Sequence, residues 1–377
     1  MTADIHKGLA GVVVDNTTIS NVVAETNSLT YRGYPVQELA ASCTFEEVAY
    51  LIWFGELPDA DQLRRFNERE RAQREVSRST ISVVDRQPDN CHPMDMLRTG
   101  VSCLGAEDPA EDDNSPESNQ AKAEAMFAKL PTIVAHDFRR RQGLERIAPD
   151  LSLGFCENFF HMCFGEVPAP EVVNCFEISM ILYAEHSFNA STFTARVVTS
   201  TLSDIYSAVT AAIGALKGPL HGGANEAVMH MMLDISDPAE AKQWLRDHLA
   251  AKGKVMGFGH RVYKDADSRV PTMKNAFVTM AELADGQRWV DMYEALEAEM
   301  LDQKGIHPNL DFPAGPAYYL MGFNIDMFTP LFVMSRITGW SAHVIEQSAA
   351  NALIRPLSSY TGLEQRSVPK ATTRLAS

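Results

Sequence analysis

The sequence predicts a mainly α-helical protein that carries a small β element at its N-terminus. Apolar residues recur at helical spacing over most of the 377 positions, whereas strand-like alternation almost disappears beyond residue 36. The composition is 45% hydrophobic, which is enough for a large core. A chain of this length fits two domains or one large domain with an insertion.

Residues 11–36, GVVVDNTTISNVV…NSLTYRGYPV, combine β-branched residues with turn formers. This composition predicts a few short strands or a hairpin. The first clear helix follows at 44–58. Thr44 is placed as its N-cap and Glu47 as the partner of a capping box, and Gly55 and Pro58 end the segment.

Two later segments also have the periodicity of helices. Residues 286–305 repeat apolar positions at helical spacing. Residues 238–253 do the same, and one face collects Ala241, Trp244, Leu245, His248 and Leu249.

Two polar segments interrupt this pattern. Residues 107–120, EDPAEDDNSPESNQ, are acidic and are expected to form an exposed loop. Residues 367–377 are expected to be loosely ordered, or ordered only by a partner.

Charge and composition exclude several classes of protein. The formal net charge is −16, which argues against general nucleic-acid binding but leaves room for a small anionic ligand at a local cationic cluster. The N-terminus has no apolar signal region, and apolar runs such as 48–54 are too short to span a membrane. No C-x-x-C pair occurs among the six cysteines. We therefore expect a cytoplasmic protein without membrane or nucleic-acid partners.

Common metal and nucleotide motifs are also absent. The sequence contains no H-E-x-x-H, no paired Cys/His spacing, no EF-hand loop and no P-loop. GFGHRV lacks the third glycine of a dinucleotide fingerprint. We expect neither a metal site nor a bound cofactor.

Polar residues gather in four places within otherwise apolar helical sequence, and two arginines follow them. The clusters are 183–192, 216–228, 254–271 and 307–315, and the arginines lie in 334–340 and 352–356.

His221 lies between a proline and two glycines at the expected start of a helix. The glycines allow a substrate or a backbone segment to approach closely. The N-terminus of a helix beside the ring favours neutral imidazole, which can donate a hydrogen bond to a carbonyl oxygen. The alternative is a histidine that only caps the helix.

His260 follows two glycines and precedes several cationic residues. Residues 252–269 carry five positive and two negative side chains, an excess that suits a ligand with phosphate or carboxylate groups. The alternative is a solvated basic face.

Asp311 lies in a proline-rich loop, PNLDFPAGP, beside Leu310 and Phe312. Partial burial there would raise its pKa and make it a usable base. The alternative is the carboxylate of an Asx turn. Two histidines, one carboxylate and several arginines together suit deprotonation next to a carbonyl, followed by attack of the enol on a second carbonyl that carries carboxylates.

The sequence resembles the citrate synthase family over essentially its whole length. Five motifs match in order and spacing: LHGGANEAV, GFGHRVYKDADSR, PNLDFPAG, SRITGW and IRP. LTYRGYPVQELA and HPMDMLRTGVS fit as well, and AEHSFNASTFTARV is most similar to the bacterial 2-methylcitrate synthases and to some dimeric citrate synthases.

The resemblance implies a role for each polar group. His221 would bind the thioester oxygen of an acyl-CoA, Asp311 would remove the α-proton, and His260 would polarise the ketone of oxaloacetate. The carboxylates of oxaloacetate and of the product would be held by His186, Arg269, Arg336 and Arg355.

Coenzyme A would be held by backbone and by one basic side chain. The residues implied are Val255, Met256, Gly257, Phe258, Gly259 and Lys264. Acyl-CoA is a substrate here and not a cofactor. Arg71 and Arg74 are two further candidates for contact with the substrates, and the resemblance assigns them no role.

The resemblance also implies a two-domain helical fold and a homodimer. Residues 1–221 and 318–377 would form a large domain, and 222–317 a small domain that closes as a lid. Arg355 would reach the site of the other subunit.

The acyl group stays open, because propionyl-CoA and acetyl-CoA differ by one methylene that a pocket separates by about 1–3 kcal/mol. The reaction would yield 2-methylcitrate, citrate or both, with release of CoA. A strict citrate synthase, a lyase running the reverse reaction and a non-catalytic protein that binds CoA esters remain alternatives.

Overall fold

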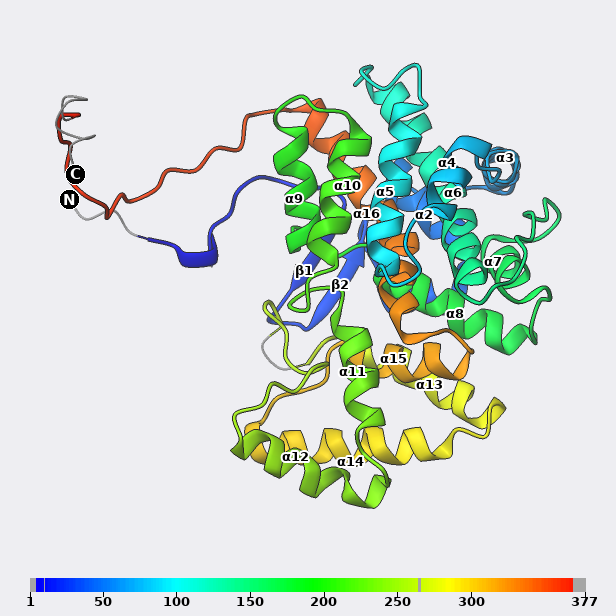
Figure 1. The fold of residues 1–377 in the computed structure, drawn as a ribbon, viewed down its shortest axis with the longest axis vertical. Helices are drawn as coiled ribbons and strands as arrows, with labels where there is room; N and C mark the ends of the chain where they lie inside the picture. Colours follow the sequence, from blue (N-terminus) through cyan, green and yellow to red (C-terminus); the bar gives the residue numbers. More distant parts are fainter. Residues whose placement is uncertain (1–4, 10, 264–265, 369–377) are drawn as a thin grey trace, which may run out of the picture.

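The computed structural model describes residues 5–9, 11–263 and 266–368 and confirms a mainly helical fold (Figure 1). A short 3₁₀ helix, η1 (Lys7–Leu9), precedes the β element. That element is an antiparallel sheet of β1 (Ser20–Val23), β2 (Ser28–Tyr31) and β3 (Tyr34–Pro35), in this order. Leu29 and Tyr31 of β2 have buried side chains.

Most helices form one large body. Its members are α1 (Val36–Ser42), α2 (Phe45–Phe54), α3 (Ala60–Ala72), α4 (Arg78–Asp85), α5 (Pro93–Ala106), α6 (Pro116–Arg141), α7 (Phe155–Phe164), α8 (Pro170–Tyr183), α9 (Ala190–Thr199), α10 (Ile205–Leu216), η3 (Ile325–Met327) and α16 (Phe328–Ala349). Helix α16 is buried along nearly its whole length and contacts α2, α5, α6, α8, α9 and α10. A helix that is apolar all round in this way forms the centre of the core.

A second group of helices packs below this body in Figure 1. It consists of α11 (Ala224–Leu233), η2 (Pro238–Glu240), α12 (Ala241–Ala250), α13 (Val270–Leu283), α14 (Gln287–Lys304) and α15 (Asp311–Leu320). Within the group α11 and α13 pack on α15, and α12 packs on α14; α13 also contacts α8, and α11 contacts α16. Helix α15 continues to Leu320, so it crosses the domain boundary predicted at 317. The two domains themselves stay a prediction.

The predicted helix ends agree with the structure where a cap was visible in the sequence. Thr44 and Glu47 form the capping box of α2, and Gly55 ends it with a positive φ of 91°. Helix α14 ends at Gly305 in the same left-handed conformation. The 238–253 segment is divided into η2 and α12, and only Ala241 and Leu245 of its apolar face are fully buried.

The prediction of a loop over 107–120 is wrong for its last five residues. Ser115 caps α6 by accepting the Ser118 N–H at 3.3 Å, and Pro116 occupies the first helical position, where it needs no N–H. Asn119 is completely buried. The acidic composition of this segment therefore led to the prediction of a loop, although α6 begins within it.

Residues 350–368 run away from the body without helix or strand, and Figure 1 shows the N-terminal segment on the same side. Ser367 and Val368 are exposed. The rest of the predicted loosely ordered tail, 369–377, lies outside the described residues.

Candidate active site

Six of the predicted site residues meet between the two groups of helices. They come from the loop between α8 and α9 and from α16 of the large body, from the loops before α11 and α13, and from the first residue of α15. The six are His186, His221, His260, Arg269, Asp311 and Arg336, and the contacts below connect them.

Asp311 is the first residue of α15 and not part of a loop as predicted. The Asx turn in this segment belongs to Asn309, whose Oδ1 accepts the Asp311 N–H at 3.1 Å and starts the helix. Pro313 fits the first turn because an N–H there has no partner within the helix. The Tyr183 hydroxyl donates to Asp311 Oδ1 at 2.6 Å. Burial raises the pKa of Asp311 to about 6, although the Tyr183 hydrogen bond and Arg269 lower it.

His221 is held by the start of α9. Its Nε2 accepts the Ser191 backbone N–H at 3.3 Å and lies 2.8 Å from Ser191 Oγ, which Trp340 Nε1 holds at 3.0 Å. Because a peptide N–H only donates, Nε2 is unprotonated and the ring proton is on Nδ1. Burial, and then the charge of Arg336, lower the pKa of His221 to about 3. The imidazole is therefore neutral.

His221 does not cap α11, because no side chain caps that helix. The glycines beside it pack closely on the end of α10. A Cβ on Gly222 would lie 2.5 Å from the Leu216 side chain, and one on Gly223 would lie 3.0 Å from the Lys217 carbonyl oxygen. Close approach of a substrate to these glycines stays a prediction.

His260 and His186 face each other with ring centroids 5.0 Å apart. His260 Nδ1 accepts the N–H groups of Val262 and Tyr263 at 3.1 and 3.2 Å, so its proton is on Nε2. Burial, and then Arg269, lower the pKa of His260 to about 4. Burial and the same arginine hold the pKa of His186 well below its usual value. Both rings are neutral.

The two arginines differ in how their guanidinium groups are satisfied. Arg269 donates from Nε and Nη2 to both oxygens of Asp267, at 2.9 and 2.7 Å. Arg336 donates from Nε to the Tyr183 carbonyl at 2.6 Å, but its buried Nη1 has no partner among the described residues. A buried donor without a partner is destabilising, and a bound carboxylate would satisfy it.

Phe332 connects the remaining members of the cluster. Its ring lies 4.1 Å from that of Tyr183 and 6.3 Å from that of His221, and the Arg336 guanidinium stands 4.7 Å from its centroid. The Phe332 ring thus lies beside His221, Arg336 and Tyr183, the last of which holds Asp311.

The 255–259 segment pairs with the residues just before α15. Gly259 N–H donates to the His307 carbonyl and Asn309 N–H to the Gly257 carbonyl, both at 2.8 Å. Gly257 has a φ of 82°, and a Cβ there would lie 2.6 Å from Val228 Cγ2. Val255, Met256 and Phe258 are partly buried against the core. This pairing fixes the loop that carries His260 to the start of the helix that carries Asp311.

Other predicted residues lie outside the cluster. Arg355 is exposed on the C-terminal segment, and its guanidinium donates a hydrogen bond to the neighbouring Pro356 carbonyl. Lys264 lies outside the described residues. Arg74 is buried against Glu70, and Arg71 faces the carbonyl of Ser152. Neither Arg71 nor Arg74 contacts the cluster.

Sequence reasoning did not single out several residues that the cluster depends on. Tyr183 and Ser191 lie inside the 183–192 segment, and Asp267 lies inside 254–271, so all three belong to clusters recognised as polar. Their partners are far away in sequence, and no pattern in the sequence showed which members contact one another. Phe332 had no polar signal at all.

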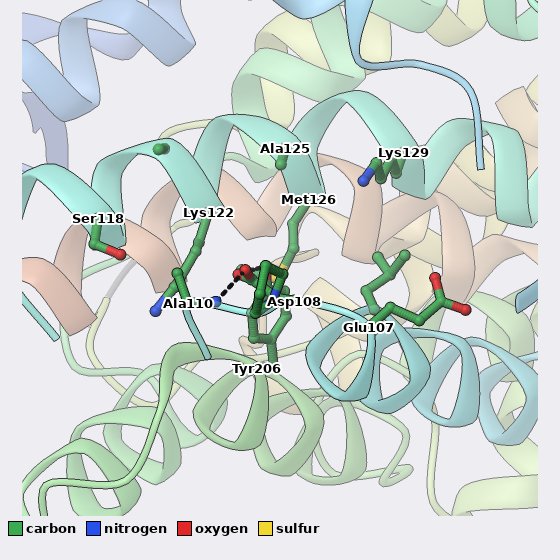
Figure 2. A pocket seen from close by; sticks show the side chains of 12 residues that line it. Glu107, Asp108, Ala110, Ser118, Lys122, Ala125, Met126, Lys129 and Tyr206 are labelled. Atoms are coloured by element: carbon green, nitrogen blue, oxygen red, sulfur yellow. Dashed lines mark hydrogen bonds between the residues drawn. The ribbon is translucent and has the colours of Figure 1, made fainter. Parts of the chain in front are cut away.

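A separate surface pocket of about 350 Å³ lies between α5, α6 and α10 (Figure 2). Lys122, Lys129, Glu107 and Tyr206 line it, and none of the predicted site residues does. In the described parts of the chain, no helix has both the length and the apolar character needed to cross a bilayer.

A buried cluster of neutral imidazoles, one carboxyl group of raised pKa and two arginines is typical of the active site of an enzyme. The family model for the citrate synthase C-terminal domain matches residues 8–357. The chain belongs to the citrate synthase family. It is 68% identical to the 2-methylcitrate synthase of Mycobacterium tuberculosis H37Rv, over 97% of this chain and 93% of that one. It is 67% identical to the citrate synthase of Mycolicibacterium smegmatis, over 97% of each.

A solved structure of citrate synthase has the same fold. The enzyme from Thermoplasma acidophilum, in a ternary complex with carboxymethyl coenzyme A and oxaloacetate, superimposes with a TM-score of 0.94. It shares 32% identity, over 99% of this chain and all of that one.

Proposed function

We propose that the protein joins an acyl-CoA to oxaloacetate, forming 2-methylcitrate from propionyl-CoA and citrate from acetyl-CoA. The observation that carries this proposal is the cluster itself. Two neutral hydrogen-bond donors, His221 and His260, and one carboxyl group with a pKa of about 6, Asp311, converge beside two arginines.

In the first step Asp311 removes a proton from the α-carbon of the thioester. His221 Nδ1–H donates a hydrogen bond to the thioester oxygen, where negative charge develops as the enol forms. A neutral imidazole suits this role because it stabilises that oxygen without adding a buried charge. Proton transfer of this kind contributes about 10²–10⁴-fold to the rate.

In the second step the enol carbon attacks the ketone carbon of oxaloacetate, and a C–C bond forms. His260 Nε2–H donates a hydrogen bond to the ketone oxygen and stabilises the alkoxide that forms there, which then takes up a proton from water. Arg269, Arg336 and His186 hold the carboxylates, and the unpartnered Nη1 of Arg336 is a donor available for one of them. Water then attacks the thioester carbonyl, the C–S bond breaks, and CoA leaves as a thiol.

Coenzyme A binds along the backbone of the 255–259 segment in this proposal, with Lys264 near a phosphate. The two groups of helices act as the large and small domains, and their closure shields the enol from water. His260 and Asp311 arrive with the small domain, whereas His186 and Arg336 belong to the large one.

We also propose a cytoplasmic homodimer in which Arg355 completes the site of the partner subunit. In its own subunit this arginine is exposed on the segment that leaves the body in Figure 1. All six cysteines are free thiols, which suits a reducing compartment.

The test compares kcat/KM for propionyl-CoA and acetyl-CoA, each with oxaloacetate, by the release of free thiol. We expect turnover of both thioesters. Absence of turnover with propionyl-CoA would leave a strict citrate synthase, and absence with both would leave a protein that binds CoA esters without reacting them.

Replacing the base tests the assignment of residues. Asp311→Asn should lower kcat by at least about 10³-fold, because an amide cannot accept the α-proton. Oxaloacetate affinity, measured by calorimetry, should stay close to that of the wild type. Near-normal turnover of the variant would reject Asp311 as the base.

A further inference from the structure

We infer that Glu185 is a positioning residue for the oxaloacetate half of the site. This inference rests on the proposed function, because it concerns how His186 and Arg336 are held for that substrate. Glu185 itself is completely buried and acts through these two residues, not on a substrate atom.

The Glu185 carboxylate is completely buried, and one of its oxygens accepts three hydrogen bonds. Oε1 accepts hydrogen bonds from Ser20 Oγ and His343 Nε2, both at 2.8 Å, and from the Ser187 N–H. Burial works against its ionisation, but His343 and Arg336 hold the pKa of Glu185 below its usual value. A buried carboxylate that stays charged and accepts three donors is a rigid anchor.

His343 is oriented from its other side. Its Nδ1 accepts from Arg196 Nε at 3.0 Å, so the ring proton is on Nε2 and is donated to Glu185. Arg196 also forms an ion pair with Glu346. The Glu185 carboxylate is therefore held by His343, which is itself held by Arg196.

The first consequence of this anchor is the position of His186. The next residue, Ser187, has a φ of 52°, a left-handed conformation that is strained for a residue with a Cβ. Its N–H is held by Glu185 Oε1 and by Ser20 Oγ, the latter at 2.9 Å. On the other side of His186, Tyr31 donates its hydroxyl to the Glu185 carbonyl at 3.0 Å. The Glu185 carboxylate thus holds the peptide group that follows His186, and Tyr31 holds the one that precedes it.

The second consequence concerns Arg336. Glu185 Oε2 has no partner among the described residues and lies against α16 at Gly339, where a Cβ would come within 2.2 Å of it. Gly339 follows Arg336 by three positions and therefore shares its helix face. The carboxylate thus lies against the face of α16 that carries Arg336, and its negative charge acts on this guanidinium, whose Nη1 is unpartnered among the described residues.

Glu185 has no direct influence on His221 or Asp311, and Arg336 is the one group through which it reaches the acyl half of the site. The charges that act on His221 and Asp311 come from Arg336, Arg269, Asp267 and Tyr183. Loss of the Glu185 anchor should therefore affect oxaloacetate binding more than acyl-CoA binding. A general loss of stability would not produce this asymmetry.

The experiment measures KM for oxaloacetate and for the acyl-CoA in Glu185→Ala and Glu185→Gln. In Glu185→Ala we expect oxaloacetate KM to rise about tenfold or more, and acyl-CoA KM to stay within about twofold, because three donors lose their acceptor on one side of the site only. Glu185→Gln keeps an acceptor oxygen and should recover part of the lost affinity. Equal changes in both KM values, or an unchanged oxaloacetate KM in Glu185→Ala, would overturn the inference.

Glu177→Gln is the matched control. Glu177 lies on α8, the helix that precedes Glu185; it accepts the Phe45 N–H at 3.0 Å and contacts no site residue, so both KM values should stay unchanged. If Glu185→Ala fails to fold, Gly339→Ala replaces it, since the added methyl displaces Oε2 without removing the carboxylate. The same selective rise in oxaloacetate KM is expected, and its absence counts against the inference.

Oxaloacetate affinity measured by calorimetry separates this inference from the proposed reaction, because it needs no turnover. A wild type that binds oxaloacetate but releases no CoA would refute the reaction, while the affinities of the variants would still decide the role of Glu185. A wild type that binds no oxaloacetate would refute both.

Discussion

The ionisation of Asp311 depends on opposing effects within one site. Burial raises its pKa to about 6, and the Tyr183 hydroxyl is the strongest influence in the other direction, through a 2.6 Å hydrogen bond that stabilises the carboxylate. His221 and His260, with pKa values of about 3 and 4, are already neutral above pH 5. The acidic limb of the rate profile should therefore report Asp311 alone.

Tyr183→Phe tests this assignment. Removing the hydrogen bond takes away a group that favours the charged form, so the pKa of Asp311 rises and the acidic limb of kcat/KM moves from near pH 6 to higher pH. Tyr318→Phe is the control, because that buried hydroxyl donates to Ser179 Oγ and not to Asp311. A Tyr183→Phe profile that coincides with that of the wild type would exclude the hydrogen bond as a determinant.

The residues of the cluster divide according to what the sequence reveals. His221, His260 and Asp311 are polar side chains among glycines and prolines, and that contrast is visible along the chain. The Tyr183–Asp311 hydrogen bond joins positions 128 residues apart, and the Glu185–His343 pair joins positions 158 apart. Such contacts are created by tertiary packing, and a single sequence carries no local signal for them.

Among the elements, the 255–259 segment has the tightest backbone requirement. Gly257 combines a φ of 82° with a site where a Cβ would meet Val228 and Phe312. Gly305 has a similar φ of 65°, but nothing lies within 4 Å of its Cβ position. The two glycines therefore separate the effect of conformation from the effect of crowding.

Gly257→Ala should raise the KM for acyl-CoA several-fold and lower stability by more than the left-handed conformation alone costs, which is about 1–2 kcal/mol. Gly305→Ala should lower stability by about that amount and leave KM unchanged. Thermal unfolding and steady-state kinetics of both variants measure the difference. Identical behaviour of the two variants would show that crowding at Gly257 has no role.

Element boundaries were predictable where a local cap marks them. The capping box of α2 and the glycine after α14 are short-range features, and both were located correctly. The starts of α6 and α15 were missed because Pro116 and Pro313 were taken as loop residues, although proline is well tolerated in the first turn. In both places a polar side chain one or two residues earlier, Ser115 or Asn309, supplies the missing signal.

At the scale of the whole molecule, the buried neutral histidines make stability depend on pH. His186, His221 and His260 have folded-state pKa values below the unfolded value, so the unfolded chain binds more protons between about pH 6.5 and 4. Stability from this source is present above pH 6.5 and is lost on acidification. Asp311 has the opposite sign, because its folded-state pKa is raised.

We expect the free energy of unfolding to fall as pH is lowered from 6.5 to 5. The three histidines contribute a slope of up to about 4 kcal/mol per pH unit. Asp311 and Glu177, whose pKa burial raises to about 7, each oppose it with up to about 1.4. Denaturant titrations at several pH values measure the slope. His260→Gln should remove about a third of the histidine contribution from it, whereas replacing the exposed His230 should leave it unchanged.

The proposed exchange of Arg355 between subunits has a consequence that only the dimer can show. Asp311→Asn and Arg355→Gln should each be nearly inactive alone. In a mixed dimer, one site receives both defects and the other receives neither, so half of the sites in each mixed dimer are restored. Random mixing of equal amounts makes half of the dimers mixed, so about a quarter of wild-type activity should return.

Co-expression of the two variants, or refolding of their mixture, makes this measurement. Each variant carried through the same procedure alone is the control, and size-exclusion chromatography verifies that dimers have re-formed. If Arg355 served its own subunit, both sites of a mixed dimer would be defective and the mixture would stay as inactive as its components. Recovery therefore requires that the arginine of one chain and the carboxylate of the other act at a single site.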